Sequence, residues 1–166
     1  MDMITATALE DEARDMIAEE FIYVRESLES GDWGEKLKLI NAHARELRDM
    51  VSALELATYR RLEEKDRLVI VTARHCNTGE LVGYSSHVHY HELHFSLHIA
   101  DDDAWYVMPE FRGCGIGRKL REKAHEELRK LGVKFVLART KVSAPHDEVI
   151  AELGYQPYEM IFRKEL

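Results

Sequence analysis

The most constraining feature of this sequence is a group of three glycines, at positions 113, 115 and 117, between an apolar run and an amphipathic pattern. The apolar run, residues 105–108, predicts a strand. From residue 116 onward, apolar residues recur at helical spacing with basic residues between them, which predicts a helix. Glycines at such a junction allow main-chain N–H groups to turn toward a ligand, and a helix N-terminus favours an anion. The sequence therefore predicts a phosphate-binding loop.

Two common phosphate-binding loops do not fit the spacing. Gly117 is followed by Arg-Lys-Leu rather than Lys-Ser/Thr, and the glycines are spaced Gly-x-Gly-x-Gly rather than Gly-x-Gly-x-x-Gly. The pattern that fits is Arg-x-x-Gly-x-Gly, formed by Arg112, Gly115 and Gly117 after a Val-x-Pro. This pattern resembles the loop with which GNAT N-acetyltransferases bind the pyrophosphate of acyl-CoA. The alternative is a glycine-rich turn before a solvated basic helix.

The order of predicted elements extends the resemblance. Hydrophobic periodicity predicts helices over 9–28 and 37–64, strands over 68–73, from 81 through the histidines and over 100–107, a helix over 116–131, a strand over 134–140, a helix over 143–153 and a strand over 158–163. Residues 1–7 are expected to form an edge strand or a frayed end. This order resembles the GNAT fold, an α/β (α+β) fold with a mixed, twisted central sheet, helices on both faces and two N-terminal helices before the core. It implies a single domain over 1–166. The run over 93–113 is also similar to GNAT proteins encoded by bacteriophages.

Charge and hydropathy restrict the function classes. The net charge is −8, and the acidic excess lies in residues 1–67, which hold 17 Asp/Glu against 10 Lys/Arg. This balance argues against non-specific nucleic-acid binding. It would suit a cationic substrate, but a solvated acidic helix face is the favoured explanation. No apolar run approaches a membrane span, and no signal peptide is evident. We expect a cytoplasmic protein that binds neither nucleic acid nor membrane.

The two cysteines, Cys76 and Cys114, predict no disulfide framework and have no metal-ligand spacing. Cys114 lies inside the glycine loop, where a small spacer residue is expected. The alternative is a reactive thiol near a helix N-terminus.

The resemblance implies acetyl-CoA as co-substrate and direct attack of an amine on the thioester in a ternary complex. The strand before the loop would offer main-chain groups to the pantetheine arm, and it would diverge from the strand over 134–140 to leave a slot for the acyl group. A main-chain N–H near Tyr106 or Val107 would polarise the thioester carbonyl. The CoA-binding residues implied in this way are Tyr106, Val107, Met108, Arg112, Gly113, Cys114, Gly115, Ile116, Gly117, Arg118 and Lys119.

An amine with a pKa of about 10.4 must lose a proton before it attacks, so a general base is expected. The candidates are the three adjacent carboxylates of residues 101–103, which should raise one another's pKa by like-charge repulsion. We expect Asp103 to be the base, with Asp101 as the second candidate; the alternative is a solvated loop of aspartates. Strand alternation predicts two faces: Asp101, Asp103 and Trp105 on one, and Asp102, Ala104 and Tyr106 on the other.

The general acid is harder to identify. Many GNAT enzymes have a tyrosine four residues before the glycine that ends the last helix. That glycine is Gly154 here, and Ile150 occupies the position of the tyrosine. Tyr155 matches an aromatic core residue and is not expected to substitute. Either solvent or another residue reprotonates the CoA thiolate, or the chain is a catalytically weak or inactive CoA-binding module with a regulatory or partner-binding role.

Five histidines lie at positions 87, 89, 91, 94 and 98. On a strand His87, His89 and His91 would share a face, which admits a transition-metal site, but their spacing of about 6.5–7 Å is awkward for three ligands. We therefore expect no metal, and a metal-binding protein with an incidental glycine turn is the alternative. His94 is a candidate base or substrate contact. The acceptor is a small-molecule or peptide amine that the sequence does not identify, and a homodimer is left open.

Overall fold

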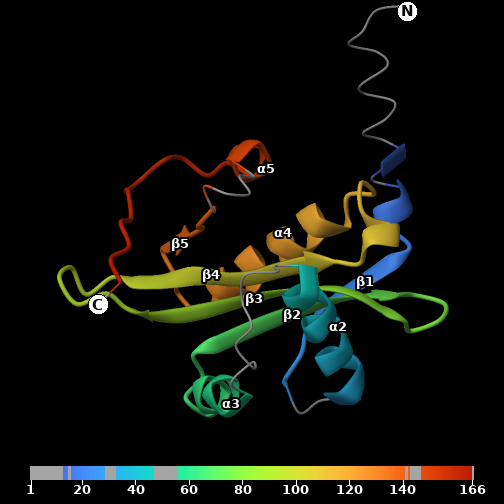
Figure 1. Ribbon diagram of the computed structural model, residues 1–166, viewed down its shortest axis with the longest axis horizontal. Coiled ribbons are helices and arrows are strands. Elements are labelled where there is room, and N and C mark those ends of the chain that lie inside the picture. The colour runs from blue at the N-terminus through green and yellow to red at the C-terminus, as the bar shows by residue number, and fades with distance from the viewer. Residues whose placement is uncertain are drawn as a thin grey trace, which may run out of the picture.

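The computed structural model describes residues 13, 14, 16–28, 33–46, 56–140, 142 and 147–165. Within these residues, five strands form one sheet in the order β1-β2-β3-β4-β5 (Figure 1). Every neighbouring pair is antiparallel except β4 and β5, which are parallel. The strands are β1 (Phe21–Arg25), β2 (Leu68–His75), β3 (Leu81–His91), β4 (His98–Val107) and β5 (Phe135–Leu137).

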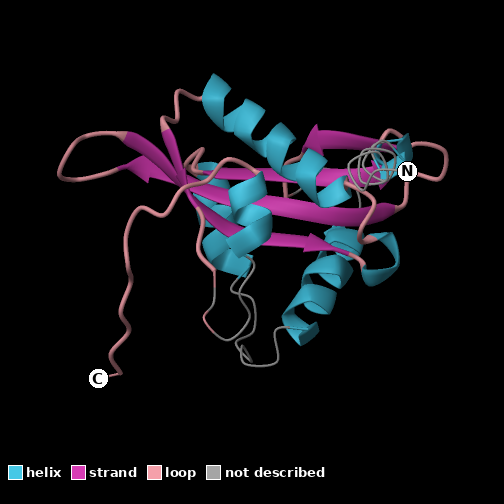
Figure 2. Cartoon of the chain, turned by 90° about the horizontal axis from the view of Figure 1, so that it is seen from above, coloured by secondary structure: helices cyan, strands magenta, loops and turns pink. Residues whose placement is uncertain are grey.

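Helices cover both faces of this sheet (Figures 1 and 2). The helix α4 (Ile116–Lys130) packs its apolar stripe, which includes Leu120, Ala124 and Leu128, against β1, β2 and β3. The opposite face carries α2 (Trp33–Glu46) and α3 (Leu56–Glu64), which contact β3 and β2 respectively. The short helix α5 (Asp147–Glu152) follows β5. No helix in the described ranges is long and apolar enough to cross a membrane.

The central elements follow the sequence closely. Leu68 to Ala73 lies within β2, and the next strand does extend through the histidines to His91. Gly79 turns the β2–β3 hairpin with a φ of 72°, in the left-handed region that glycine adopts without strain. Gly132 ends α4 in the same conformation, with a φ of 84°, as expected for a C-terminal glycine.

The helix predicted over 9–28 is wrong in its second half. Residues 13, 14 and 16–18 are helical, but β1 begins at Phe21. Its sequence, FIYVR, is aromatic and β-branched, and β2 supplies a complete antiparallel partner from Phe21↔His75 to Arg25↔Val71. Residues at helical spacing in this region also fit a strand, and pairing with β2 decides between the two.

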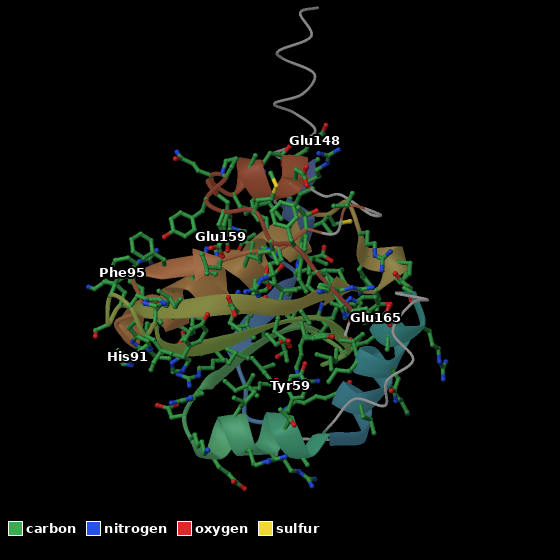
Figure 3. The ribbon with its side chains drawn as sticks, turned by 60° about the vertical axis from the view of Figure 1, so that its left-hand side comes forward. Tyr59, His91, Phe95, Glu148, Glu159 and Glu165 are labelled. Carbon is green, nitrogen blue, oxygen red and sulfur yellow. The ribbon has the colours of Figure 1, made fainter. Side chains whose placement is uncertain are left out.

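Two other predicted elements differ from the structure. The helix expected over 37–64 is two helices, α2 and α3, and residues 47–55 between them lie outside the described part, as do residues 1–7. The strand expected over 158–163 is absent: residues 155–165 have no regular structure. Glu159 and Glu165 mark the course of this segment in Figure 3, and Tyr158 and Phe162 are exposed to 78% and 85%.

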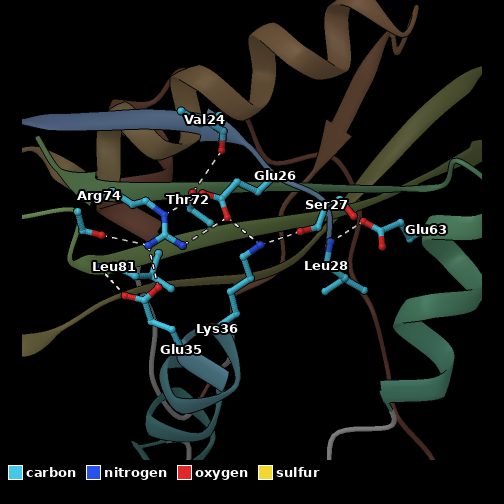
Figure 4. Close-up of polar contacts among 11 residues, drawn as sticks. Val24, Glu26, Ser27, Leu28, Glu35, Lys36, Glu63, Thr72, Arg74 and Leu81 are labelled. Atoms are coloured by element: carbon cyan, nitrogen blue, oxygen red, sulfur yellow. Dashed lines mark hydrogen bonds and ion pairs between the residues drawn. The ribbon is translucent and has the colours of Figure 1, made fainter. Parts of the chain in front are cut away.

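A partly buried polar cluster around the buried Lys36 attaches α2 to the sheet (Figure 4). Lys36 Nζ donates to the carbonyl of Ser27 and lies 2.7 Å from Glu26 Oε2, while Arg74 donates to Glu26 Oε1 at 2.8 Å and to Glu35 Oε2 at 2.8 Å. Burial raises the pKa of Glu26, but the hydrogen bonds from Arg74 and Lys36 outweigh it and lower the pKa to about 2. This cluster fixes the position of α2, which contributes to the site described below.

Candidate active site at the divergence of two strands

The two parallel strands β4 and β5 pair over only three residues. Ile99, Ala100 and Asp101 face Phe135, Val136 and Leu137, and β5 ends there while β4 continues to Val107. No described residue pairs with the remaining β4 edge, from Asp102 to Val107, on the β5 side. The pairing of these strands therefore stops well before the end of β4, and this side of β4 is unpaired among the described residues.

Main-chain groups of β4 point alternately toward β3 and toward the unpaired side of the strand. The N–H of Met108 donates to the carbonyl of Val82 on β3 at 2.9 Å, so alternation also directs the main-chain groups of Tyr106, opposite Tyr84, toward β3. The main-chain groups of Trp105 and Val107 consequently face the unpaired side of β4. Consistent with this, the carbonyl of Val107 accepts a hydrogen bond of 2.7 Å from Arg112 Nε. Of the N–H groups of Tyr106 and Val107, only that of Val107 points away from β3, as polarising a thioester carbonyl would require.

Two structural features explain why the loop has glycine at these three positions. Gly113 and Gly115 both have a φ of 78°, which side-chain-bearing residues rarely adopt. Gly117 lies against the indole of Trp105, and a Cβ at this position would approach Trp105 Cζ2 to 2.6 Å. The 3₁₀ turn Pro109–Phe111 leads from β4 into this loop.

The loop presents the N-terminus of α4 without a side-chain cap. Gly115 is the N-cap residue, and it has no side chain that could bond to the N–H groups of the first turn. The N–H groups of that turn have no partner within the helix, and the helix dipole adds partial positive charge there. This arrangement is the one predicted for binding a phosphate.

The basic side chains at the loop have different surroundings. Arg112 donates to both carboxylate oxygens of Glu46, at 3.0 and 2.8 Å, so its guanidinium braces the loop against the end of α2. Lys119 Nζ lies 3.4 Å from Glu19 Oε1, and Arg118 is exposed. Cys114 is a free, half-buried cysteine whose thiol lies 3.6 Å from the carbonyl of Arg112, and Cys76 is free and exposed.

A β-bulge on β4 changes the predicted alternation beyond the aspartates. Ser86 is opposite Ala104 and the next residue, His87, is opposite Asp102, so Asp103 is the extra residue on β4. Asp101 and Asp103 do share a face, the one covered by α2 and α3. Asp102 and Trp105 lie together on the α4 face, and the prediction that Trp105 shares a face with Asp103 is wrong. The three carboxylates consequently have separate partners.

Asp103 is exposed, and its carboxylate contacts side chains that line a small pocket between the sheet and the helices α2 and α3. Its Oδ2 accepts hydrogen bonds from the Tyr59 hydroxyl at 2.6 Å and the Ser86 hydroxyl at 2.9 Å, and both residues line the pocket. Burial, and then the Asp103 carboxylate, raise the pKa of Tyr59, so this hydroxyl stays a neutral donor. Asp101 instead pairs with Arg139 at 3.1 Å and accepts from Tyr90 at 3.3 Å.

Aromatic side chains connect this pocket with the glycine loop. The rings of His43 and Tyr106 stack at 4.9 Å, and His43 Nδ1 lies 2.8 Å from the Tyr84 hydroxyl. The Tyr106 hydroxyl donates to Glu46, the same carboxylate that binds Arg112. A continuous set of contacts therefore runs from the pocket to the loop.

The opposite face holds a buried charged network. Arg121 of α4, 2% exposed, pairs with Asp102 at 2.5 Å and lies over the Trp105 ring at 4.3 Å. Burial, and then the charges of His125 and Arg121, lower the pKa of His87 to about 3. Burial, and then Arg121, lower the pKa of His125 to about 4. Both imidazoles are therefore neutral near pH 7.

The histidine-rich segment lies at the other end of the sheet. His94 is exposed in the β3–β4 hairpin, and the structure does not bring it near the glycine loop or the Asp103 pocket. Figure 3 shows His91 and Phe95 together at this hairpin, away from Tyr59. His91 stacks on His98 at 4.6 Å, and His89 Nδ1 lies 3.0 Å from His98 Nε2. No group of three metal-ligating residues occurs among the residues that the structure describes.

The sequence matches the acetyltransferase (GNAT) family over residues 35–155, which is most of the chain. The chain belongs to the GNAT family. A comparison with curated protein sequences gives no match.

Solved GNAT structures share the fold. An acetyltransferase from Trypanosoma brucei has a TM-score of 0.68 at 20% identity, covering 88% of this chain and 99% of that chain. An aminoglycoside acetyltransferase from an uncultured soil metagenomic sample, in complex with sisomicin, has a TM-score of 0.71 at 15% identity, covering 90% and 99%. Glucosamine-6-phosphate N-acetyltransferase from Arabidopsis thaliana has a TM-score of 0.65 at 18% identity, covering 87% and 97%. At these identities the likeness shows the GNAT fold alone.

At the position where many GNAT enzymes carry a tyrosine, Ile150 lies in α5. The nearby Tyr155 hydroxyl lies 2.6 Å from His125 Nε2. Burial raises the pKa of Tyr155 to about 12, although Arg121 opposes this, so the hydroxyl remains protonated at neutral pH.

Sequence reasoning missed several residues of this GNAT site. Tyr59, Ser86 and Glu46 reach it from elements far apart in the chain, and none belongs to a local motif. Arg121 looked like part of a solvated basic helix face. The only local indication that Arg121 would be buried is its position one helical turn after Gly117, on the face that meets β4.

Proposed function

We propose that residues 1–166 form a single N-acetyltransferase domain that transfers the acetyl group of acetyl-CoA to a primary amine. The observation that carries this proposal is the uncapped N-terminus of α4 directly beside the unpaired edge of β4. Together they offer N–H donors for a pyrophosphate and, further along, main-chain groups for an amide-containing pantetheine arm. Membership of the GNAT family agrees with this use.

The residues fit acetyl-CoA. The N–H groups over Gly113 to Gly117 would hold the pyrophosphate, with Arg118 and Lys119 adding positive charge. Arg112 would act through its bond to Glu46, which keeps the loop in place. The N–H of Val107 would donate to the thioester carbonyl and stabilise the oxyanion that develops during attack.

Asp103 is the proposed general base. An amine near its carboxylate gives up a proton, directly or through water, and the free nitrogen attacks the thioester carbon. The C–N bond forms, the C–S bond breaks, and the CoA thiolate leaves. A free thiol has a pKa of about 8.5, so the thiolate can take its proton from solvent, and no dedicated acid is required. Tyr59 and Ser86 would orient the carboxylate toward the acceptor.

Isothermal titration of acetyl-CoA tests the binding step. Gly115→Asp introduces a carboxylate at the N-cap, where it would repel the pyrophosphate. Gly79→Asp is a matched control, because Gly79 has a similar φ, 72° against 78°, but lies in the β2–β3 hairpin. We expect micromolar binding by the wild type and Gly79→Asp, and no measurable binding by folded Gly115→Asp. Absence of binding by the folded wild type would overturn the proposal.

The alternative function is a CoA-binding module without efficient catalysis. Ile150 at the position of the family tyrosine is the observation that favours it. Acetyl-CoA binding without turnover of any amine would support this alternative.

A further inference from the structure

One carboxylate, that of Glu46 on α2, is bonded both to the glycine loop and to the strand that precedes the loop. Its two oxygens accept hydrogen bonds from Arg112 Nη2 at 3.0 and 2.8 Å, and Oε1 also accepts from the Tyr106 hydroxyl at 3.0 Å. Arg112 donates in turn through Nε to the carbonyl of Val107 at 2.7 Å, and its guanidinium lies 5.3 Å from the centroid of the Tyr106 ring. Glu46, Tyr106, Val107 and Arg112 therefore form a closed ring of contacts.

This ring holds the main chain on both sides of the Val107 N–H, the group that points to the unpaired side of β4. The preceding residue, Tyr106, is held by the bond from its hydroxyl to Glu46. The carbonyl that follows the N–H is held by Arg112. A hydrogen-bond donor whose direction is fixed in advance needs no reorganisation when charge develops on a substrate oxygen.

We propose that Glu46 is a positioning residue for both parts of the reaction. Through Arg112 it holds the glycine loop for acetyl-CoA, and through Tyr106 it directs the Val107 N–H toward the thioester carbonyl. This inference rests on the proposed function and extends it, because one carboxylate then controls the oxyanion donor as well as the loop. The hydrogen bond from Arg112 lowers the pKa of Glu46, so the carboxylate is ionised at neutral pH.

The sign of the effect on binding distinguishes positioning from simple charge. Acetyl-CoA carries several negative charges on its phosphates, so a carboxylate beside the glycine loop should repel it. If Glu46 acted only through its charge, Glu46→Gln would tighten acetyl-CoA binding. If Glu46 positions the loop through Arg112, the same substitution weakens binding even though it removes the repulsion.

Isothermal titration of acetyl-CoA tests the bond to Arg112. We expect Glu46→Gln to raise the Kd about three- to fivefold, the upper range for an exposed ion pair. Glu110→Gln is the matched control, because Glu110 is exposed in the 3₁₀ turn beside the loop and forms no ion pair with a described residue. Its Kd should equal that of the wild type or be lower. In an Arg112→Met background, Glu46→Gln should no longer raise the Kd, because the partner of the carboxylate is gone.

The infrared carbonyl stretch of acetyl-CoA, labelled at the carbonyl carbon and bound at saturation, tests the bond to Tyr106 without an acceptor. A hydrogen bond from the Val107 N–H polarises the carbonyl and lowers this frequency relative to free acetyl-CoA. Tyr106→Phe removes only the hydroxyl, so the frequency should return part of the way to the free value while the Kd stays that of the wild type. Glu46→Gln should change both quantities, and Glu110→Gln should not raise either.

The outcomes separate this inference from the proposed function. Unchanged or tighter acetyl-CoA binding by Glu46→Gln overturns the inference and leaves the acetyltransferase intact. A carbonyl frequency that neither Glu46→Gln nor Tyr106→Phe alters also overturns it. Failure of the folded wild type to bind acetyl-CoA overturns the proposed function itself, and the role of Glu46 with it.

Weaker binding and a smaller frequency shift in Glu46→Gln, with Glu110→Gln behaving as the wild type, support the positioning role. If Glu46→Gln does not fold, Arg112→Met and Tyr106→Phe test the two bonds separately. Arg112→Met should then raise the Kd and Tyr106→Phe should change the carbonyl frequency; an unaltered value in either variant overturns the inference.

Discussion

Arg121 on α4 and Asp102 on β4 form a buried ion pair, one residue away from a carboxylate that faces the other side of the sheet. The two groups lie 2.5 Å apart, and their side chains are exposed to only 2% and 7%. Asp102 faces α4 and Asp103 faces α3, where it bonds to Tyr59, and the bulge at Asp103 returns Trp105 to the α4 face. The pair therefore anchors the bulged segment of β4 from behind.

Breaking this pair should destabilise the fold. Arg121→Met leaves Asp102 buried without its partner, and the expected loss is about 3–5 kcal/mol in the free energy of unfolding. Arg139→Met is the control, because the Arg139–Asp101 pair is largely exposed and should contribute at most about 1 kcal/mol. Chemical denaturation measures both. Equal losses for the two variants would contradict the structural role of the buried pair.

Gly117→Ala should destabilise the junction between β4 and α4. Its Cβ would lie 2.6 Å from Trp105 Cζ2, and overpacking of this kind costs about 1–3 kcal/mol. Adding Trp105→Leu should recover part of the loss, because the smaller side chain leaves room for the methyl group. A double-mutant cycle in urea measures the coupling, and strictly additive losses would show that the contact is not responsible.

Asp103→Asn should lower kcat of amine acetylation by about 10²–10⁴, the usual contribution of a general base. Asparagine is similar in size and can still accept a hydrogen bond from Tyr59 or Ser86, so acetyl-CoA affinity and stability should change little. Asp101→Asn is the matched control on the same face, and its kcat should remain within a few-fold of the wild type. If Asp101→Asn is the slower enzyme, the base has been assigned to the wrong carboxylate.

Stability should fall in mild acid because of His87 and His125. Their folded pKa values, about 3 and about 4, lie below the ordinary value of 6.5. Between pH 6.5 and 4 the unfolded chain therefore binds protons that the folded chain does not, and folding becomes less favourable as the pH falls. Each pKa unit corresponds to about 1.4 kcal/mol.

A variant identifies the responsible group. His87 faces Asp102, Arg121 and His125, and His87→Phe removes its ionisation. The free energy of unfolding should then depend less steeply on pH between 6.5 and 4. An unchanged slope would assign the acid sensitivity to other groups.

The glycine loop and α4 could be predicted because their signals are local. Glycine spacing, the preceding apolar run and helical periodicity all lie within about thirty residues and agree with one another. β1 was missed because its apolar residues fit helical spacing as well as a strand. Only its pairing with β2, about fifty residues later, distinguishes the two.

The acceptor side could be predicted only in outline. Asp103 was selected from three aspartates, but the bulge that puts Trp105 on the opposite face from Asp103 depends on pairing with β3 and leaves no mark in the composition. Tyr59 bonds to Asp103 although the two residues are 44 positions apart in the sequence. Arg121 is charged, and it is buried because it pairs with Asp102. Such contacts require the assembled sheet.

The unpaired edge of β4 also bears on how this sheet is completed. If pantetheine amides bond to Trp105 and Val107, the co-substrate takes the place of the missing neighbouring strand, and binding it finishes the sheet. Amide hydrogen exchange at these two residues would then slow on saturation with CoA, while Tyr106, already directed to β3, would change little. In that sense the substrate would be a structural element of the protein that consumes it.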